Sequence, residues 1–234
     1  MGFGCIMGDM DANDKKILQM RVKRTIEALG KNHIQATFIP EVKDVAPMVR
    51  SLMAKGSSCA VGGSISLFES GVIDLLNSGD YDFKSRYAAK TPEEVLASQY
   101  AAFTVDTFLA SANAVTEHGE LYLVDGKGTR IAPIIFGPKQ VILVCSTDKI
   151  VPDLQAAVVR VKEEAAPANV LRLGCDTACA KNGRCMNPTC DSRNLMALPA
   201  GACEHTVCRD YLVLGNQLVP NRIKVLFVPA QIGY

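Results

Sequence analysis

This sequence lacks several features that would assign a function class directly. It has 25 lysines and arginines against 24 aspartates and glutamates, so the net charge is +1 and there is no positive excess to neutralise nucleic-acid phosphates. No apolar run approaches the roughly 18–20 residues that cross a bilayer. Tryptophan is absent, and aromatic residues make up only 6%. We therefore expect no nucleic-acid partner and no membrane span.

The chain is long enough to bury a substantial core. It has 234 residues, of which 48% are hydrophobic and 21% charged, a balance that argues against widespread disorder. Residues 1–9 contain neither a basic stretch nor an apolar stretch long enough for export. Because a second methionine, Met10, opens the next segment, we predict an extension over residues 1–10 and a single domain over 11–234. Since these residues carry no export signal, we expect a cytoplasmic protein.

Helices and strands alternate along the first half of the chain. Thr91, Pro92 and Glu94 have the pattern of a helix start, as N-cap, first helical residue and capping-box partner, so a helix should run from there toward Phe108. Apolar spacing predicts the elements before it. These are a helix over 14–29, a strand over 34–39, a helix over 45–53 and a strand over 59–61.

The second half is richer in short apolar runs, separated by turn sequences such as Asp125-Gly126. The alternation before them and the strand cluster here predict an α/β fold with a mainly parallel sheet and an added antiparallel element. The expected elements are strands over 108–110, 121–124, 131–135 and 141–145, a helix over 154–164 and a strand over 223–228.

A glycine-rich turn is the first candidate site. The strand over 59–61 enters Gly62 and Gly63, and a helix is expected to begin at Ser64 or Ser66. Glycines allow close approach of the backbone to a ligand, while free N–H groups and hydroxyls attract an anion. Glu69, one turn later, is a candidate catalytic base. An N-capped turn without a ligand is the alternative, since the pattern matches no established phosphate-binding motif.

A cysteine-rich segment over residues 175–208 is the second candidate site. Its turn-forming residues can bury little apolar surface, so a cross-link is needed to order it. In a cytoplasmic protein, clustered thiols favour zinc or an iron–sulfur cluster over disulfides, although no pair has the C-x2-C spacing. Disulfides or free thiols remain the alternative. Six of the nine cysteines lie here: Cys175, Cys179, Cys185, Cys190, Cys203 and Cys208.

Several stretches in order along the chain resemble the LUD family, named for lactate utilisation. They are Val61-Gly62-Gly63-Ser64, Glu69-Ser70-Gly71, residues 111–121, Asp125-Gly126, Phe136-Gly137-Pro138-Lys139, Lys149-Ile150-Val151, residues 165–173 and Ile232-Gly233-Tyr234. The resemblance implies a three-layer α/β fold related to sugar-phosphate isomerases, glucosamine-phosphate deaminases and CoA transferases. It also implies a ligand site formed by Gly62, Gly63, Ser64, Ser66, Asn113, Thr116 and Glu117.

The cysteine segment is similar to that of a subgroup of this family. The resemblance implies a metal site at Cys179, Cys185, Cys190 and Cys208. Cys190 follows Cys185 after four residues, where the subgroup has two, so Cys203 or His205 could replace Cys190 or Cys208.

Three functions fit these features. The first is binding of a small anionic metabolite in lactate-type redox metabolism, with a cysteine-bound metal or iron–sulfur cluster and iron–sulfur redox subunits as partners. The second is an isomerase-like or transferase-like enzyme acting on a sugar phosphate or an acyl-CoA. The third is a non-catalytic binding module with structural zinc. A homo-oligomer is compatible with all three.

Overall fold

The main sheet is fully parallel in the computed structural model, which describes residues 10–185, 203 and 205–234. Both faces of its central strands are buried, which explains why they read as continuous apolar runs. The strand order is β1 (Gln35–Phe38), β10 (Ile223–Val228), β7 (Gln140–Ser146), β4 (Thr107–Ala110), β2 (Ser58–Val61) and β3 (Asp82–Phe83).

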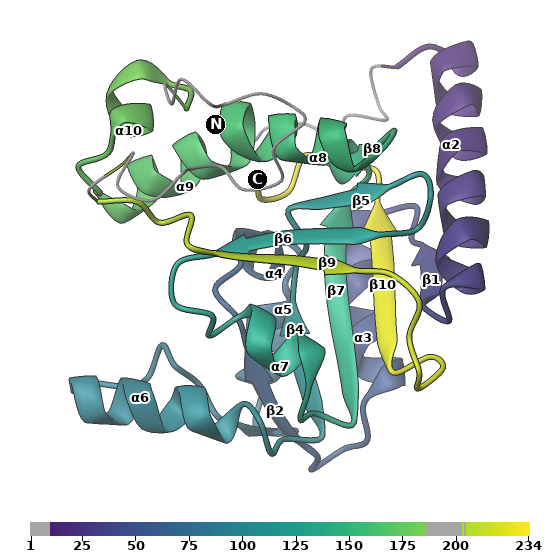
Figure 1. Ribbon diagram of the computed structural model, residues 1–234. Coiled ribbons are helices and arrows are strands. Elements are labelled where there is room, and N and C mark those ends of the chain that lie inside the picture. The colour runs from purple at the N-terminus through teal and green to yellow at the C-terminus, as the bar shows by residue number, and fades with distance from the viewer. Residues whose placement is uncertain (1–9, 186–202, 204) are drawn as a thin grey trace.

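Short helices cover one face of the main sheet (Figure 1). Alternate strand residues such as Ile142, Val144 and Leu226 point to this face and pack against helix residues such as Val49 and Leu67. The elements on this side are η1 (Val42–Asp44), α3 (Val45–Leu52), α4 (Ile65–Glu69) and α5 (Val72–Leu76).

A smaller sheet and the long N-terminal helix α2 (Ala12–Lys31) cover the other face. Leu143, Val225 and Phe227 of the main sheet share a core with Leu29 of α2 and Leu123 of the smaller sheet. Figure 1 shows the strands of the smaller sheet running across β7 and β10. Their order is β8 (Ile150–Val151), β5 (Ala114–Thr116), β6 (Leu121–Asp125) and β9 (Asp210–Leu214), and β6 is antiparallel to both of its neighbours.

Helices of the C-terminal half lie over the outer side of the smaller sheet. Tyr122 and Val124 of β6 pack against Ala157, Val158 and Val161. These helices are α8 (Leu154–Arg160), the π-helix η3 (Val161–Ala165), α9 (Ala166–Leu173) and α10 (Ala178–Asn182). The α/β class and the mainly parallel sheet with flanking helices are therefore confirmed.

Two local predictions need correction. The run over 131–135 is the short helix α7 (Ile131–Ile135), so the predicted strand there is wrong. Periodicity cannot separate a strand from a buried helix in so short an apolar run, and Pro133 lies in the first turn, where its missing N–H is tolerated. Helix α6 (Pro92–Ala101) begins as predicted, with Thr91 Oγ1 accepting from the Glu94 N–H at 3.2 Å. The helix ends at Ala101 and does not continue toward Phe108, which belongs to β4.

The remaining element is η2 (Thr147–Lys149), which follows β7 directly. Some predictions fall on residues that the structure does not describe: most of the extension over 1–10, Cys190 and the middle of the cysteine-rich segment. Within the described residues, no helix is both long and apolar enough to cross a membrane.

Candidate functional site

A cavity of about 480 Å³ lies where several parallel strands end. Its walls include Ser64 after β2, Ser111 after β4 and Lys149 after β7, together with Tyr234 after β10. Residues of α9 and of the segment before β9 enclose the opposite side. Ligands of open α/β sheets commonly bind at the carboxyl ends of the strands. The position and size of the cavity therefore mark it as the candidate site.

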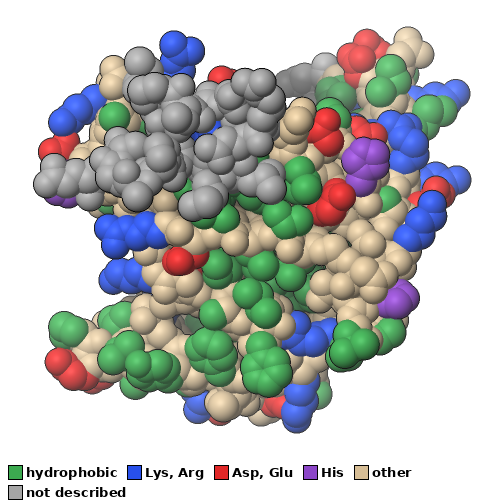
Figure 2. Space-filling model, viewed as in Figure 1, with side chains coloured by type: hydrophobic (Ala, Val, Ile, Leu, Met, Phe, Trp, Pro, Cys, Tyr) green, Lys and Arg blue, Asp and Glu red, His purple; other side chains and the backbone are tan. Residues whose placement is uncertain are grey.

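Cationic side chains dominate the lining of this cavity. Asp125 is the single acidic residue among the described lining residues, and its carboxylate already accepts the N–H groups of Gly126 and Arg130, both at 2.8 Å. Blue side chains are visible at the left of Figure 2, between the grey atoms and the region of α6. The six lining cations are Arg86, Lys127, Arg130, Lys149, Arg172 and Arg209. A nearly neutral protein thus concentrates positive charge at one cavity, which favours an anionic ligand.

The glycine-rich turn contributes one wall. Gly63, Ser64 and Ser66 line the cavity, as the sequence predicts for a ligand site. The Ser64 hydroxyl is buried and has no hydrogen-bond partner among the described residues, so its hydrogen-bonding capacity is unused. Helix α4 has only five residues, so its N-terminus adds little and the attraction for anions comes from the cationic side chains.

Gly62 has a different role from its neighbour. It lies behind the cavity lining, where a Cβ atom would stand 2.7 Å from Cγ of Arg130. A hydrogen atom at this position leaves room for the arginine side chain to cross the backbone of the turn. Gly62 therefore serves the site by making space for Arg130.

Arg130 is held by neutral oxygen atoms. Its Nη2 donates to Asn113 Oδ1 at 2.9 Å and to the Val124 carbonyl at 2.6 Å. Burial lowers the pKa of Arg130, opposed by nearby Asp125, and the guanidinium remains charged because its ordinary pKa is so high. Asn113, a predicted ligand residue, lines the cavity and also positions this arginine. Sequence reasoning left the region of Arg130 undecided as a site, because the cavity that this side chain lines forms only in the folded chain.

Lys149 lies at the inner end of the cavity and is 1% exposed. Its Nζ donates to Ser66 Oγ at 3.1 Å and to Ser111 Oγ at 3.0 Å. Burial lowers the pKa of Lys149 to about 8. The sequence offered only a weak signal for this residue, its place in the Lys149-Ile150-Val151 stretch that resembles the LUD family.

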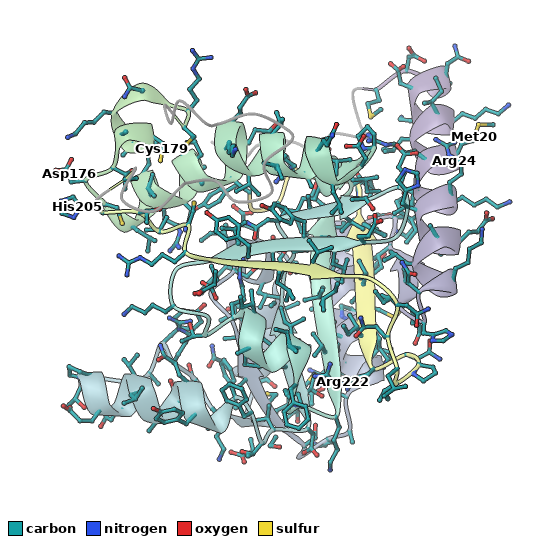
Figure 3. The ribbon with its side chains drawn as sticks, in the orientation of Figure 1. Met20, Arg24, Asp176, Cys179, His205 and Arg222 are labelled. Atoms are coloured by element: carbon teal, nitrogen blue, oxygen red, sulfur yellow. The ribbon has the colours of Figure 1, made fainter. Side chains whose placement is uncertain are left out.

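Other predicted site residues lie away from the cavity lining. Glu69 accepts the Gly233 N–H at 2.7 Å and so holds the C-terminal turn beside Ser66. Thr116 bonds to the neighbouring Glu120 side chain. Glu117 forms ion pairs with two arginines of α2, one of which, Arg24, is labelled in Figure 3. These contacts attach the C-terminal turn and the β5–β6 hairpin to the rest of the fold.

Three described cysteines of the C-terminal segment lie near enough to Cys208 to influence its thiol. Cys208 lines the cavity, and its pKa is raised to about 12, first by burial and then by the nearby thiols of Cys179, Cys185 and Cys203. Figure 3 shows Cys179 at the α9–α10 end of the molecule, the end that also carries His205. No group of three or more Cys, His, Asp or Glu residues within the described ranges is arranged to hold a metal ion.

The remaining described cysteines fall into two settings. Cys59 in β2 and Cys145 in β7 are fully buried, as expected for core thiols. Cys175 follows α9, and its N–H donates to the Val170 carbonyl at 3.0 Å. All seven cysteines with described positions are free thiols.

Comparisons with known proteins were made on this basis. A family model described as the LUD domain matches residues 22–228. No curated protein matches the chain. A DUF162 family protein from Deinococcus radiodurans is 14% identical, with a TM-score of 0.51, over 90% of this chain and 98% of that chain.

Two further solved structures match about half of the chain. eIF2B beta from Chaetomium thermophilum is 16% identical, with a TM-score of 0.34, over 48% of this chain and 43% of that chain. Ribose 5-phosphate isomerase from Plasmodium falciparum is 14% identical, with a TM-score of 0.30, over 47% of this chain and 52% of that chain. At these identities and TM-scores, neither similarity indicates a function for this chain.

Proposed function

Because the chain belongs to the LUD domain family, we propose that it binds a small anionic metabolite in this cavity and contributes to organic-acid redox metabolism of the lactate type. The observation that carries the binding proposal is the set of six cationic side chains around the cavity, where Asp125, the single acidic residue of the described lining, is already hydrogen-bonded. Charge-assisted hydrogen bonds from such groups are the usual means of holding carboxylates and phosphates. The redox role comes from the family resemblance, and we place it in the cytoplasm.

A Gly63→Val variant tests whether the glycine-rich turn contacts the ligand. In the wild-type protein, a ligand at about 100 times its Kd should raise the Tm by roughly 5–10 °C. The valine should remove this rise, because its methyl groups would extend into the cavity from a position 3.8 Å from Nη1 of Arg86. Thermal unfolding with inorganic phosphate, lactate, pyruvate, ribose 5-phosphate and acetyl-CoA provides the measurement.

The matched control for this substitution is Gly215→Val, at a position where a Cβ meets no atom within 4 Å. This variant should keep the full ligand-induced rise. If none of the five compounds raises the Tm of the wild-type protein, the binding proposal is wrong.

We further propose that the cysteine-rich segment holds a metal, either an iron–sulfur cluster or zinc. The ligand set implied by the resemblance is Cys179, Cys185, Cys190 and Cys208, and Cys203 or His205 could replace Cys190 or Cys208. The proximity of Cys179, Cys185 and Cys203 to Cys208 supports a site made of thiolates. The described cysteine side chains are not arranged to hold an ion, so they would have to move when the metal binds. An iron–sulfur cluster would supply one-electron transfer beside the cavity, whereas zinc would be structural.

Single Cys→Ser variants test the metal site. Each substitution at Cys179, Cys185 or Cys208 should remove most of the bound metal from protein purified without oxygen, because each ligand contributes to an apparent binding free energy of roughly 10–16 kcal/mol. Comparing Cys190→Ser with Cys203→Ser shows which residue completes the set. Elemental analysis measures the metal, and a brown colour separates iron–sulfur from zinc.

The controls are Cys59→Ser and Cys145→Ser, because these two cysteines are buried in strands of the main sheet and lie outside the cysteine-rich segment. They should leave the metal content unchanged. If protein prepared under reducing, oxygen-free conditions contains no metal and its cysteines are paired in disulfides, the metal proposal is wrong. Colourless, zinc-loaded protein without any ligand response would instead favour a non-catalytic module with structural zinc.

A second candidate is an isomerase-like or transferase-like enzyme acting on a sugar phosphate or an acyl-CoA. The favouring observation is the size of the cavity, about 480 Å³, which lies in the range that holds cofactor-sized ligands. Arg86, Arg172 and Arg209 supply several separate positions for phosphate oxygens. Responses to ribose 5-phosphate or acetyl-CoA that exceed those to lactate would favour this candidate. Iron–sulfur redox subunits as partners remain a proposal of the first candidate, and a homo-oligomeric state remains a proposal that fits either candidate.

A further inference from the structure

Lys149 is a buried cation without a carboxylate partner. Its side chain is 1% exposed, and none of the ion pairs among the described residues includes it. The groups that hold its Nζ, Ser66 Oγ and Ser111 Oγ, are neutral. A buried charge in such surroundings is normally compensated by an opposite charge, so this lysine needs an explanation.

The electrostatic surroundings do not supply the missing charge. Arg160 of α8 and Arg130 at the start of α7 disfavour the ammonium form, while the thiol of Cys145 and the carboxylate of Glu69 favour it. Burial, together with the two arginines, outweighs Cys145 and Glu69, and the pKa falls to about 8. Glu69 is itself exposed and bonded to the Gly233 N–H, so it does not reach the lysine as a direct partner.

The hydrogen bonds of the cluster leave one donor unused. The Ser66 hydroxyl donates to the Ile232 carbonyl at 3.3 Å, and the Ser111 hydroxyl donates to the Ala112 carbonyl at 3.2 Å. Both hydroxyl oxygens are therefore free to accept from Lys149. An ammonium group has three N–H donors, of which these two serines take two. Because Lys149 lines the cavity, the third donor is available to a ligand there.

We propose that Lys149 anchors the ligand through an oxyanion, a carboxylate or phosphate oxygen that accepts its third N–H bond and supplies the missing negative charge. This inference rests on the proposed function and specifies it, because it assigns the anionic group of the ligand to the inner end of the cavity. The cations nearer the outside, such as Arg172 and Arg209, then contact other parts of a longer ligand.

Two consequences follow. The ligand should bind with uptake of a proton above pH 8, because a bound oxyanion favours the ammonium form of a lysine that is partly neutral there.

In the ligand-free protein the lysine should be a destabilising residue. The pKa is about 8 in the folded chain and 10.5 in the unfolded chain, so the unfolded chain binds more protons between these values. The destabilisation is therefore full below pH 8 and fades as the pH rises toward 10.5.

The test uses Lys149→Met, with Lys16→Met on the exposed face of α2 as the matched control. At pH 7 without ligand, Lys149→Met should unfold at a Tm roughly 2–10 °C above that of the wild-type protein. This gain should shrink by pH 9.5. The same variant should lose at least about ten-fold in affinity for a probe, since a charge-assisted hydrogen bond disappears. Lys16→Met should change neither quantity.

The probes are inorganic phosphate and pyruvate, measured by calorimetry at pH 8.5 in two buffers with different ionisation enthalpies. Buffer-dependent heats in the wild-type protein that vanish in Lys149→Met are the expected result, and the probe with the larger affinity loss shows whether phosphate or carboxylate occupies the anchor. A lower Tm for Lys149→Met at pH 7 would overturn the inference, because the lysine would then stabilise the free fold. Equal probe binding by variant and wild type would overturn the inference while leaving the proposed function standing. Failure of both probes, and of ribose 5-phosphate and acetyl-CoA, to bind the wild-type protein would overturn both.

Discussion

An Arg130→Met variant should bind inorganic phosphate or ribose 5-phosphate roughly 10- to 150-fold more weakly than the wild-type protein. The guanidinium lines the cavity and stays in place through bonds to Asn113 Oδ1 and the Val124 carbonyl. Hydrogen bonds from a charged donor contribute about 1.5–3 kcal/mol, which corresponds to this range of affinities. Isothermal titration calorimetry of folded, purified variants measures the change.

A second arginine provides the control for this substitution. Arg222, labelled in Figure 3, also donates to main-chain carbonyls, at 2.8–3.2 Å, but it does not line the cavity. Arg222→Met should therefore lower the Tm without changing the affinity. An Arg130→Met variant with unchanged affinity would show that the anion does not contact this wall of the cavity.

Gly119→Ala should destabilise the fold by about 3 kcal/mol or more and lower the Tm by roughly 6–12 °C. This glycine has a φ of +89°, and a Cβ would lie 2.6 Å from the carbonyl carbon of Ala28 and 2.9 Å from the amide nitrogen of Leu29. Backbone atoms of α2 cannot move aside as a flexible side chain would. The hairpin must then separate from the helix, and the ion pairs of Glu117 with Arg21 and Arg24 weaken with it.

Gly79→Ala separates the conformational strain from the steric overlap. Gly79 has a nearly identical φ of +88°, but a Cβ there meets no atom within 4 Å. The substitution should cost only about 1 kcal/mol, the strain of a left-handed alanine. Urea denaturation of both variants measures the difference, and equal losses would show that contact between the hairpin and α2 contributes nothing to stability.

Secondary structure followed from the sequence wherever a local signal was strong. The alternation of apolar helices and strands predicts the parallel sheet, because strands buried on both faces read as continuous apolar runs. The N-cap at Thr91 was equally readable. Short apolar segments were not, since the run over 131–135 fits a strand or a buried helix turn equally well. Strand β9 (Asp210–Leu214) was not predicted at all, and it is defined by its pairing with β6.

The candidate site could likewise be predicted from the sequence only in part. The glycine-rich turn was recognisable, because a strand followed by two glycines and two serines predicts close approach of the backbone to a ligand. The structure then distinguishes the two glycines, with Gly63 at the cavity and Gly62 making room for Arg130. The stretch after β4 is divided as well, since Asn113 lines the cavity while Glu117 is paired with α2. Adjacent positions in a sequence motif therefore serve binding and packing separately.

The sequence by itself determined the fold class, the family resemblance and the position of the glycine-rich turn, because these depend on local spacing and on residue order. Only the tertiary structure revealed that six cations from five separate segments surround one cavity, and that Lys149 lacks a carboxylate partner among the described residues. A count of charges gives +1 for the whole chain and contains no information on which charges meet. Electrostatic interactions depend on distance in space, and parallel strands bring residues from distant parts of the chain to the same edge of the sheet.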